Sequence, residues 1–412
     1  KHSKTLKIAC MINIEAFIAK HITFREKSFF QDDLLRYENL LRLQIEGKSA
    51  LVIGGGGTIG SSFIRALLKF NPARLYVVDL SENYLTELTR DLRSTLGMRV
   101  PDDYKTYPIN FSDPVFDKIL QDAGPFDIVA NFAAHKHVRS EKDQFSVIAL
   151  LENNIIKAEQ LLGKLAASPP EHFFCVSTDK AANPVNIMGA SKKIMEEVIM
   201  AYAGRFPVST ARFANVAFSN GSLLAGYLER MMKHQPLSCP SDIRRFFVSP
   251  EESGQICLMA CILGKTGEIF FPKLNEEQMM NFKDITIEFL KQQGFDTRIC
   301  ASEEEARYEA SIMQADSKSY PVYFFKSDTS GEKTFEEFFT EGEELDLSTF
   351  SSLGIIKNAP RRSMDEIRNM VGELKRVMQT PGLSKAEIVK VMTSFLPGFH
   401  HIETGKNLDQ KM

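Results

Sequence analysis

The fold is decided by residues 51–60, Leu51-Val52-Ile53-Gly54-Gly55-Gly56-Gly57-Thr58-Ile59-Gly60. An apolar run enters a glycine-rich turn, and a helical pattern follows over residues 58–70. Glycine adopts positive φ without strain and lets the backbone approach a phosphate closely, because it has no Cβ atom. The N-terminus of the following helix offers free N–H groups and a partial positive charge. The spacing GxxGxxG between a strand and a helix therefore predicts a dinucleotide-binding turn.

Short apolar runs rich in β-branched and aromatic residues alternate with helical stretches after this turn. The runs that we predict as strands are residues 49–53, 75–78, 127–132, 172–177 and 208–213. Apolar strands separated by helices are typical of a parallel sheet covered on both faces. The sequence thus predicts an α/β fold, a doubly wound parallel sheet of the Rossmann type, with a smaller mixed substrate-binding region and additional helices at both ends.

The pattern along the chain divides it into four regions. We expect an N-terminal helical extension over residues 1–47, an NAD-binding Rossmann domain over 48–235, a mixed α/β substrate-binding region over 236–345, and a C-terminal helical extension over 346–412. A serine followed three residues later by glutamate predicts helix starts at Ser249, Ser363 and Ser384.

Composition excludes several classes of protein. Of the 412 residues, 43% are hydrophobic and 25% are charged, which is ordinary for a globular protein and rules out a disordered or collagen-like chain. The formal net charge of −3 gives no general attraction to nucleic acid or to anionic membranes. No apolar run approaches the roughly 18 residues that a membrane-spanning helix needs. The six cysteines are dispersed and form no CxxC, which favours a reduced, cytoplasmic protein.

Asp79 stands at the end of the second predicted strand. Its carboxylate can accept hydrogen bonds from the adenosine ribose hydroxyls and would repel a 2′-phosphate. The residues that follow it, Leu80-Ser81-Glu82-Asn83, contain no cation to hold such a phosphate. NAD is therefore favoured over NADP as the cofactor. The alternative interpretation of Asp79 is a helix-capping or turn aspartate.

Further motifs lie after the later strands. They are Asn131-Phe132-Ala133-Ala134-His135-Lys136-His137-Val138, Val176-Ser177-Thr178-Asp179-Lys180-Ala181-Ala182-Asn183-Pro184, Met188-Gly189-Ala190-Ser191-Lys192, Arg212-Phe213-Ala214-Asn215-Val216, Arg244-Arg245-Phe246-Phe247, Ser327-Asp328-Thr329-Ser330-Gly331-Glu332-Lys333 and Glu403-Thr404-Gly405-Lys406-Asn407. Over roughly residues 48–412 the chain resembles the UDP-N-acetylglucosamine 4,6-dehydratases of the bacillosamine and legionaminic-acid pathways. These enzymes are extended short-chain dehydrogenases/reductases of the polysaccharide biosynthesis family. The resemblance implies an extended fold of that superfamily, tight binding of NAD, and a nucleotide-sugar substrate.

One position departs from the superfamily's pair of a tyrosine and a lysine four residues apart. Met188 stands where the tyrosine belongs, and Lys192 is retained. A thioether is a poor proton acceptor, so alcohol oxidation by the tyrosine route is excluded. Either the chain is inactive or another group takes over this role. Within the dehydratases that the chain resembles, methionine at this position marks the form that keeps the configuration at C5.

A 4,6-dehydration needs one acid and one base on neighbouring carbons, with the hydride carried by the cofactor. An adjacent aspartate and lysine suit this task if burial keeps the aspartate protonated and the lysine neutral. The resemblance implies that Asp179 is the acid at O6 and Lys180 the base at C5. It also implies that Thr178 binds the C4 hydroxyl and that Lys192 holds the nicotinamide ribose. The alternative for the Asp179-Lys180 pair is a surface turn.

The predicted site residues form three groups. The catalytic group is Thr178, Asp179, Lys180, Met188 and Lys192. The cofactor contacts are Gly54, Gly57, Thr58, Ile59, Gly60, Asp79, Ser81, Asn110, Phe111, Ala133, Ala134 and Lys192. The substrate contacts are Lys136, His137, Asn215, Ser219 and Arg245, where Arg245 has a surface ion pair as its alternative.

Two other positions have competing interpretations. Asn154 is either the superfamily's structural asparagine or a residue on a helix surface. His135 and His137 alternate as metal ligands do, but the sequence offers no third ligand at a suitable spacing. No metal site is therefore expected.

The sequence thus predicts an NAD-dependent hydro-lyase that converts a nucleoside-diphosphate N-acetylglucosamine into its 4-keto-6-deoxy product with the C5 configuration kept. One alternative is a nucleotide-sugar 4-epimerase, which moves hydride at C4 only and has no use for an Asp-Lys pair. A second is a non-catalytic NAD-binding regulator, which Met188 makes conceivable. We expect a homo-oligomer with no nucleic-acid or membrane partner. The sequence leaves open whether the nucleotide is UDP or GDP, the downstream pathway and the number of subunits.

Overall fold

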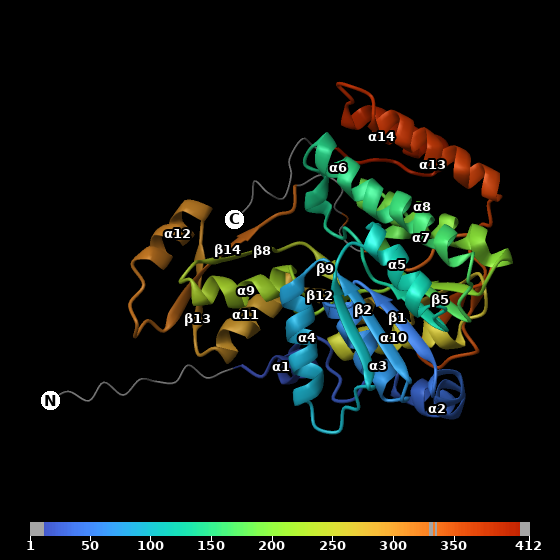
Figure 1. Ribbon diagram of the computed structural model, residues 1–412. Helices are drawn as coiled ribbons and strands as arrows, with labels where there is room; N and C mark the ends of the chain where they lie inside the picture. Colours follow the sequence, from blue (N-terminus) through green and yellow to red (C-terminus); the bar gives the residue numbers. More distant parts are fainter. Residues whose placement is uncertain (1–11, 329–332, 334–335, 404–412) are drawn as a thin grey trace.

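The computed structural model describes residues 12–328, 333 and 336–403 (Figure 1). Cys10, residues 329–332 of the motif that begins at Ser327, and the C-terminal motif from residue 404 onward lie outside the described residues.

A nine-stranded sheet forms the centre of the molecule. Its strands are β1 (Ser49–Ile53), β2 (Arg74–Asp79), β3 (Asp103–Pro108), β4 (Ile128–Asn131), β5 (His172–Val176), β6 (Val208–Ala211), β11 (Glu268–Pro272), β15 (Leu345–Asp346) and β16 (Leu353–Ile356). They lie in the order β15-β16-β11-β6-β5-β4-β1-β2-β3. Every pairing from β3 to β11 is parallel, and β16 and β15 extend the sheet in antiparallel fashion. The predicted fold class is confirmed, and each of the five predicted strands forms.

Helices cover both faces of this sheet because each parallel connection crosses over one face or the other (Figure 1). The connections through α3 (Thr58–Leu68) and α4 (Glu82–Ser94) cover one face, where α10 (Pro250–Leu263) packs against α3. The connections through α5 (Pro114–Ala123), α7 (Lys157–Leu165) and α8 (Ile187–Ala201) cover the other. The strand order reverses between β1 and β4, so the crevice that parallel sheets use for ligands opens at their carboxyl ends.

A smaller unit is built on a second sheet of three parallel strands, β13 (Asp296–Cys300), β14 (Ser319–Phe325) and β8 (Leu237–Pro240). The helices α9 (Leu223–Met232), α11 (Phe282–Gln292) and α12 (Glu303–Ser311) lie beside it, on the left of Figure 1. It has its own apolar core, which includes Leu237, Phe289 and Tyr320. Short pairings of β7 (Asn215–Val216) with β10 (Phe247–Val248), and of β9 (Arg244–Arg245) with β12 (Met280–Asn281), order the segments that run between the two units.

The chain passes between the two units more than once. The strands β11, β15 and β16 belong to the main sheet, although they lie beyond residue 235, where we expected the sheet domain to end. The regular alternation of strands and helices loosens after that point because residues of both units follow one another in the sequence. The division into four regions stays a prediction.

The terminal helices pack onto this framework. The helix α1 (Ile14–His21) adds Phe17 to the core of the small unit, and α2 (Gln31–Ile45) adds Leu41 to the core of the large one. Between them, Arg25 forms an ion pair of 2.8 Å with Glu252 at the start of α10. The N-terminal extension thus contacts both units.

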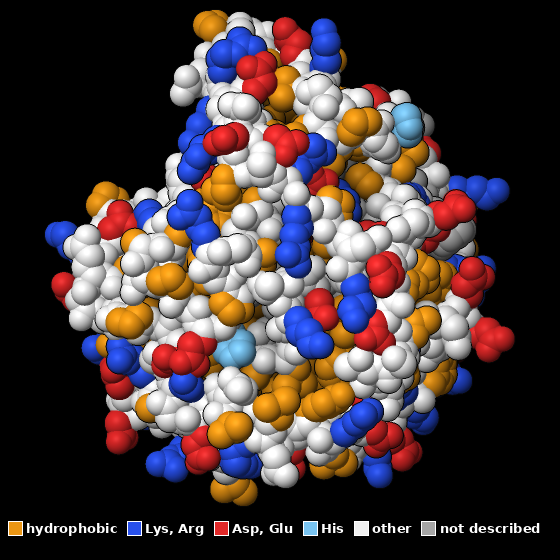
Figure 2. All heavy atoms as spheres, turned by 90° about the vertical axis from the view of Figure 1, so that its right-hand side faces the viewer, with side chains coloured by type: hydrophobic (Ala, Val, Ile, Leu, Met, Phe, Trp, Pro, Cys, Tyr) orange, Lys and Arg blue, Asp and Glu red, His pale blue; other side chains and the backbone are white. Residues whose placement is uncertain are grey.

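At the other end of the chain, α13 (Met364–Met378) and α14 (Lys385–Phe395) lie over the side that carries α8 (Figure 1). Figure 2 shows the face on the right-hand side of Figure 1, and acidic and basic side chains are interspersed over it. The predicted capping boxes at Ser249, Ser363 and Ser384 all form. Within the described ranges, no helix combines the length and the apolarity that crossing a bilayer requires.

A buried ion-pair network joins the end of β6 to α8. The guanidinium of Arg212 is fully buried and lies 2.7 Å from Glu196 of α8 and 3.0 Å from Glu343. Glu196 also accepts a 2.6 Å hydrogen bond from the hydroxyl of Ser177, the residue before Thr178. Burial acts to raise the pKa of Glu196, but the pairing with Arg212 outweighs it and holds this pKa at about 2. The network therefore fixes α8 against the segment that leaves β5.

We expect Glu196→Gln to lower the free energy of unfolding by about 3 kcal/mol near neutral pH, because the variant leaves a buried guanidinium short of one partner. The pKa of Glu196 is about 2 in the folded protein, against an ordinary value of 4.5. The ionised carboxylate thus stabilises the fold above its unfolded pKa, and this stabilisation is lost as the pH falls through the folded pKa. Urea unfolding from about pH 7 to about pH 3 measures the effect. The difference between wild type and variant should shrink as the pH falls, and a constant difference would contradict the assignment.

Candidate functional site

The glycine-rich turn leaves no room for a Cβ atom at Gly54 or Gly60. Gly54 has φ +74°, and a Cβ atom on it would lie 2.5 Å from the backbone nitrogen of Ala133. A Cβ atom on Gly60 would lie 2.3 Å from the carbonyl oxygen of Gly54. The backbone N–H of Gly56 donates to Asp79 over 3.0 Å. Asp79 thus closes the turn, as the turn interpretation expects.

A cavity of about 250 Å³ opens at this turn, at the carboxyl ends of β1, β2 and β4. Among the described residues that line it, Asp79 is the one acidic side chain, so its carboxylate remains placed to meet hydroxyl donors. Ten of the twelve predicted cofactor contacts line the cavity, and these are Gly54, Gly57, Thr58, Ile59, Gly60, Asp79, Asn110, Phe111, Ala133 and Ala134.

The two other predicted cofactor contacts have different partners. Ser81 caps α4, because its hydroxyl accepts from the N–H of Tyr84. The ammonium of Lys192 is buried and donates to the carbonyl of Val176 over 2.7 Å. Burial lowers the pKa of Lys192.

The turn fits a dinucleotide. Gly57 precedes the first turn of α3, and a Cβ atom there would meet only the carbonyl oxygen of Gly54, at 3.6 Å. The chain therefore does not need glycine at this position for its own packing. A phosphate approaching the N-terminus of α3 does need the space that a side chain would fill.

The predicted acid/base pair lies at the carboxyl end of β5. Thr178 caps a short 3₁₀ helix, Asp179–Ala181, and donates its hydroxyl to Oδ1 of Asp179 over 2.8 Å. The ammonium of Lys180 lies 3.1 Å from the same oxygen. The side chain of Asp179 is 3% exposed and that of Lys180 is 17% exposed. The pair is thus enclosed, which excludes the surface-turn interpretation.

A second carboxylate, Glu336, approaches the same lysine. Its Oε1 lies 3.8 Å from the ammonium of Lys180 and 3.9 Å from the guanidinium of Arg245. Glu336 is 4% exposed and Arg245 is 6% exposed, so Arg245 is not part of a surface ion pair. No pattern in the sequence indicates Glu336, because the contact joins residues that lie far apart in the chain.

The charges around Lys180 oppose the neutral state that a base needs. Burial lowers the pKa of Lys180, but the carboxylates of Asp179 and Glu336 outweigh it and raise this pKa above its ordinary value. Burial alone therefore does not meet the condition that the acid/base role sets for this lysine, because burial has also brought carboxylates next to it.

The start of α8 packs directly onto the Asp179–Ala181 segment. A Cβ atom on Gly189 would lie 2.5 Å from the carbonyl oxygen of Lys180, so this contact requires glycine. Met188 is 2% exposed, and its backbone N–H donates to the buried carboxylate of Glu141 over 2.8 Å. The structure thus brings the predicted catalytic residues together where β5 ends and α8 begins.

Asn154 is a buried structural residue and does not lie on a helix surface. It sits in a π-helical turn, Glu152–Ile156, and its side-chain amide makes two backbone hydrogen bonds of 2.9 Å with His135. It also donates to the hydroxyl of Ser191 on α8 over 3.0 Å. Asn154 therefore ties the loop after β4 to α8.

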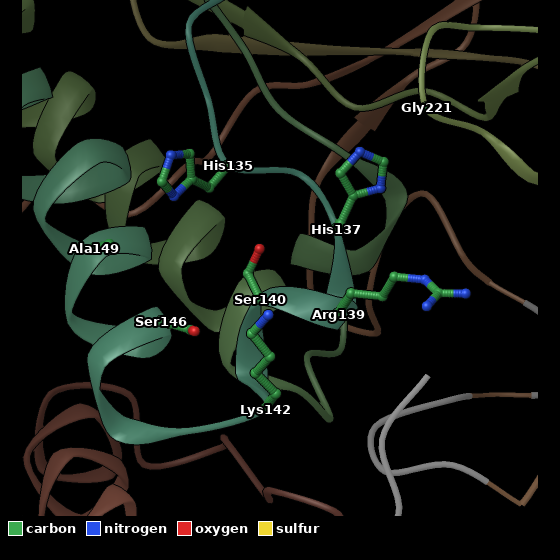
Figure 3. Close-up of a pocket in the computed structure, with 8 residues that line it drawn as sticks. All are labelled: His135, His137, Arg139, Ser140, Lys142, Ser146, Ala149 and Gly221. Atoms are coloured by element: carbon green, nitrogen blue, oxygen red, sulfur yellow. The ribbon is translucent and has the colours of Figure 1, made fainter. Parts of the chain in front are cut away.

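A second cavity, of about 370 Å³, lies beyond this loop (Figure 3). The rings of His135 and His137 lie on one side of it, and Gly221 approaches from another loop. Its remaining lining comes from Arg139, Ser140, Lys142, Ser146 and Ala149, so the described residues contribute no carboxylate to it. Burial, with help from neighbouring cations, lowers the pKa of both histidines. His135 lines both cavities, so the two adjoin.

The other predicted substrate contacts are Lys136, in the loop after β4, and Asn215 and Ser219, in the segment after β6. Lys136 donates to the carbonyl of Asn220 over 3.1 Å, and burial lowers its pKa. Asn215 lies on β7, and Ser219 is buried just after it. Among the described residues, no group of three or more His, Cys, Asp or Glu side chains could hold a metal ion.

The sequence matches one protein family over most of its length. The family of polysaccharide biosynthesis proteins matches residues 50–358. The chain belongs to this family. The match takes in the glycine-rich turn, the Asp179-Lys180 pair and Glu336.

Individual relatives with different names are similar to this chain. An uncharacterized membrane protein of Methanocaldococcus jannaschii is 33% identical over 59% of this chain and 72% of its own length. A capsular polysaccharide biosynthesis protein of Staphylococcus aureus is 26% identical over 73% of this chain, which spans about half of that relative (49%). A UDP-glucose 4-epimerase of Rickettsia typhi is 27% identical over 55% of this chain and 66% of its own length.

Solved structures share the fold of this family member. Pen from Bacillus thuringiensis superimposes with a TM-score of 0.62 at 20% identity, covering 80% of this chain and 98% of that one. DesIV, a dTDP-glucose 4,6-dehydratase from Streptomyces venezuelae solved with NAD, gives a TM-score of 0.53 at 17% identity, covering 85% of this chain and 97% of that one. At these identities, the likeness concerns the fold alone.

We expect Gly57→Ala to weaken NAD binding about tenfold or more while leaving the urea midpoint of unfolding near the wild-type value. The added methyl group makes only an ordinary contact within the protein, but it occupies the space at the N-terminus of α3 that a phosphate needs. Isothermal titration with NAD measures the affinity. Gly60→Ala is the matched comparison, because its methyl group collides inside the turn and should lower stability as well. Unchanged NAD affinity in Gly57→Ala would contradict the assignment of this turn.

Proposed function

We propose that the chain binds NAD at the glycine-rich turn and acts as a nucleoside-diphosphate N-acetylglucosamine 4,6-dehydratase that keeps the configuration at C5. The observation that carries this proposal is the enclosed Asp179-Lys180 pair, which lies next to a buried methionine instead of a tyrosine. A dehydration needs both an acid and a base, and this pair supplies them at the end of a strand where such folds bind ligands. Membership of the polysaccharide biosynthesis family agrees with a nucleotide-sugar substrate.

Each residue of the catalytic segment has a place in this reaction. Bound NAD would accept hydride from C4 of the sugar and return it to C6. The hydroxyl of Thr178 would hydrogen-bond the C4 hydroxyl and relay the proton that this hydroxyl loses as the hydride leaves C4. Lys180 would take the proton from C5, which the neighbouring ketone makes acidic, and return it to C5 after water has left. Asp179 would protonate the C6 hydroxyl, which leaves as water. Lys192 would hold the nicotinamide ribose.

The ion pair seen in the structure is one proton transfer away from the state that this reaction uses. Moving a proton from the ammonium of Lys180 to Oδ1 of Asp179, across 3.1 Å, leaves a neutral amine and a protonated carboxyl group. The total charge of the pair is unchanged, so the transfer requires no partner from solvent. One step thus creates both the base and the acid.

A nucleotide-sugar 4-epimerase is the second candidate, because one relative is a UDP-glucose 4-epimerase. An epimerase moves hydride at C4 only and leaves the C5 proton and the C6 hydroxyl in place. It therefore gives the enclosed acid/base pair no task. The mass of the product distinguishes the two reactions.

We expect incubation with UDP- or GDP-N-acetylglucosamine to yield a product lighter by one water, and the same reaction in D₂O to place deuterium at C5. Mass spectrometry of the intact nucleotide sugar measures both changes. A product of unchanged mass would identify an epimerase. Bound NAD with no turnover of either substrate would identify a non-catalytic protein, and either result would overturn the proposal.

We expect Lys180→Met to abolish exchange of the C5 proton with solvent while NAD affinity stays at the wild-type value. A thioether cannot carry the proton, and loss of a general base costs roughly 10²–10⁴-fold in rate. Met188→Ala is the matched control on the neighbouring helix, and it should retain substantial turnover because methionine serves there as packing. Deuterium incorporation at the wild-type rate in Lys180→Met would refute the base assignment, and complete loss of activity in Met188→Ala would refute the packing role.

A further inference from the structure

Two carboxylates, Asp179 and Glu336, lie close to two cations, Lys180 and Arg245. Asp179 and Glu336 both lie within 4 Å of the lysine ammonium, and Arg245 lies 3.9 Å from Glu336. All four side chains are buried or nearly so, with exposures between 3% and 17%. Charges this well shielded from water interact strongly, so the state of one group depends on the others. Glu336 has no part in the dehydration described above.

We infer that Glu336 is a positioning residue that holds the proton on Lys180 and anchors Arg245 beside it, an inference that rests on the proposed role of Lys180 as the base. Glu336 reaches the cluster from the segment after Lys333, whereas Lys180 follows β5 and Arg245 lies on β9. One carboxylate thus brings together three separate parts of the chain. Its removal should make Lys180 easier to deprotonate.

The charged groups that the described residues place near Lys180 and Glu336 determine the direction in which the pKa of Lys180 changes. Lys180 faces Asp179 and Glu336, whose charges raise its pKa, and Arg245, whose charge lowers it. Burial, together with the charge of Asp179, raises the pKa of Glu336, although Lys180, Arg245 and Lys333 favour its ionised form. A neutral amide in place of Glu336 removes one of the two carboxylates that raise the pKa of Lys180, so the lysine loses its proton at lower pH.

The experiment measures the titration of Lys180 without substrate. The full-length protein is labelled with lysine carrying ¹³C at the ε-carbon, and the Lys180 signal is the one missing from K180R. We expect Glu336→Gln to lower the titration midpoint of Lys180 by about one pH unit or more, as removal of an opposite charge at this distance does. Glu337→Gln is the matched control, because this neighbouring side chain is half exposed and binds Asn183 and not Lys180. Glu336→Asp keeps the charge and should hold the midpoint closer to that of the wild type.

The possible outcomes separate this inference from the proposed function. An unchanged midpoint in Glu336→Gln, or an equal change in Glu337→Gln, would overturn the role of Glu336 whatever the enzyme's substrate is. A selective change in Glu336→Gln would support it. In the dehydratase assay, the same variant should then begin C5 deuterium exchange at a pH lower by the same amount. Absence of a dehydrated product from the wild-type protein would refute the proposed function and leave the titration result intact.

Discussion

The site depends on the burial of a lysine between carboxylates at the carboxyl end of the central sheet. Removing a single charge from water is costly, and a lone buried lysine would lose its proton. Here Asp179 and Glu336 restore the charged form, while Arg245 keeps the group as a whole close to neutral. The cluster is therefore stable in the folded protein and remains within one proton transfer of a neutral amine. Any reaction that uses Lys180 starts from this arrangement of charges.

A second set of buried charges, Glu196 and Arg212, holds the strand end that leads to Asp179 and Lys180. Ser177 immediately precedes Thr178, and its hydroxyl binds Glu196, which pairs with Arg212 at the end of β6. Glu196 lies one helical turn after Lys192 on α8. Asn154 links the same helix to the loop after β4, which lines both cavities. The helix, the strand end and the loop thus share one hydrogen-bonded framework, so the positions of the reacting groups are set by the core and not by the surface.

The sequence predicted the parts of the fold that rest on local chemistry. The glycine spacing identified the turn because a Cβ atom on Gly54 or Gly60 would collide with neighbouring backbone. The strand β3 escaped prediction, since this edge strand carries polar side chains such as Asp103 and Lys105. The strands β11, β15 and β16 were also missed, because segments of the smaller unit separate β11 from β6, and β15 and β16 from β11, along the chain. The capping boxes did mark the later helices, as capping needs only four consecutive residues.

The same distinction explains what the sequence predicted of the site. Asp179, Lys180, Met188 and Lys192 lie within one strand–helix connection, so their proximity is a consequence of local geometry. Glu336 comes from a segment more than a hundred residues away, and its charge adds to that of Asp179 in raising the pKa of Lys180 against the effect of burial. The protonation state of a buried group depends on its burial and also on the charges near it, and some of those charges come from segments far away in the sequence.

Met188 gives the site its remaining chemical constraint. A tyrosine at this position would place a second proton carrier beside the substrate, on the helix that faces the Asp179-Lys180 pair. A thioether carries no exchangeable proton, so a single amine is left to serve the C5 position. A base that removes and returns a proton from one side of a carbon restores the original configuration. In the proposed reaction, retention at C5 thus follows from there being one proton carrier for the C5 position, Lys180, to which the buried Met188 of α8 adds no second one.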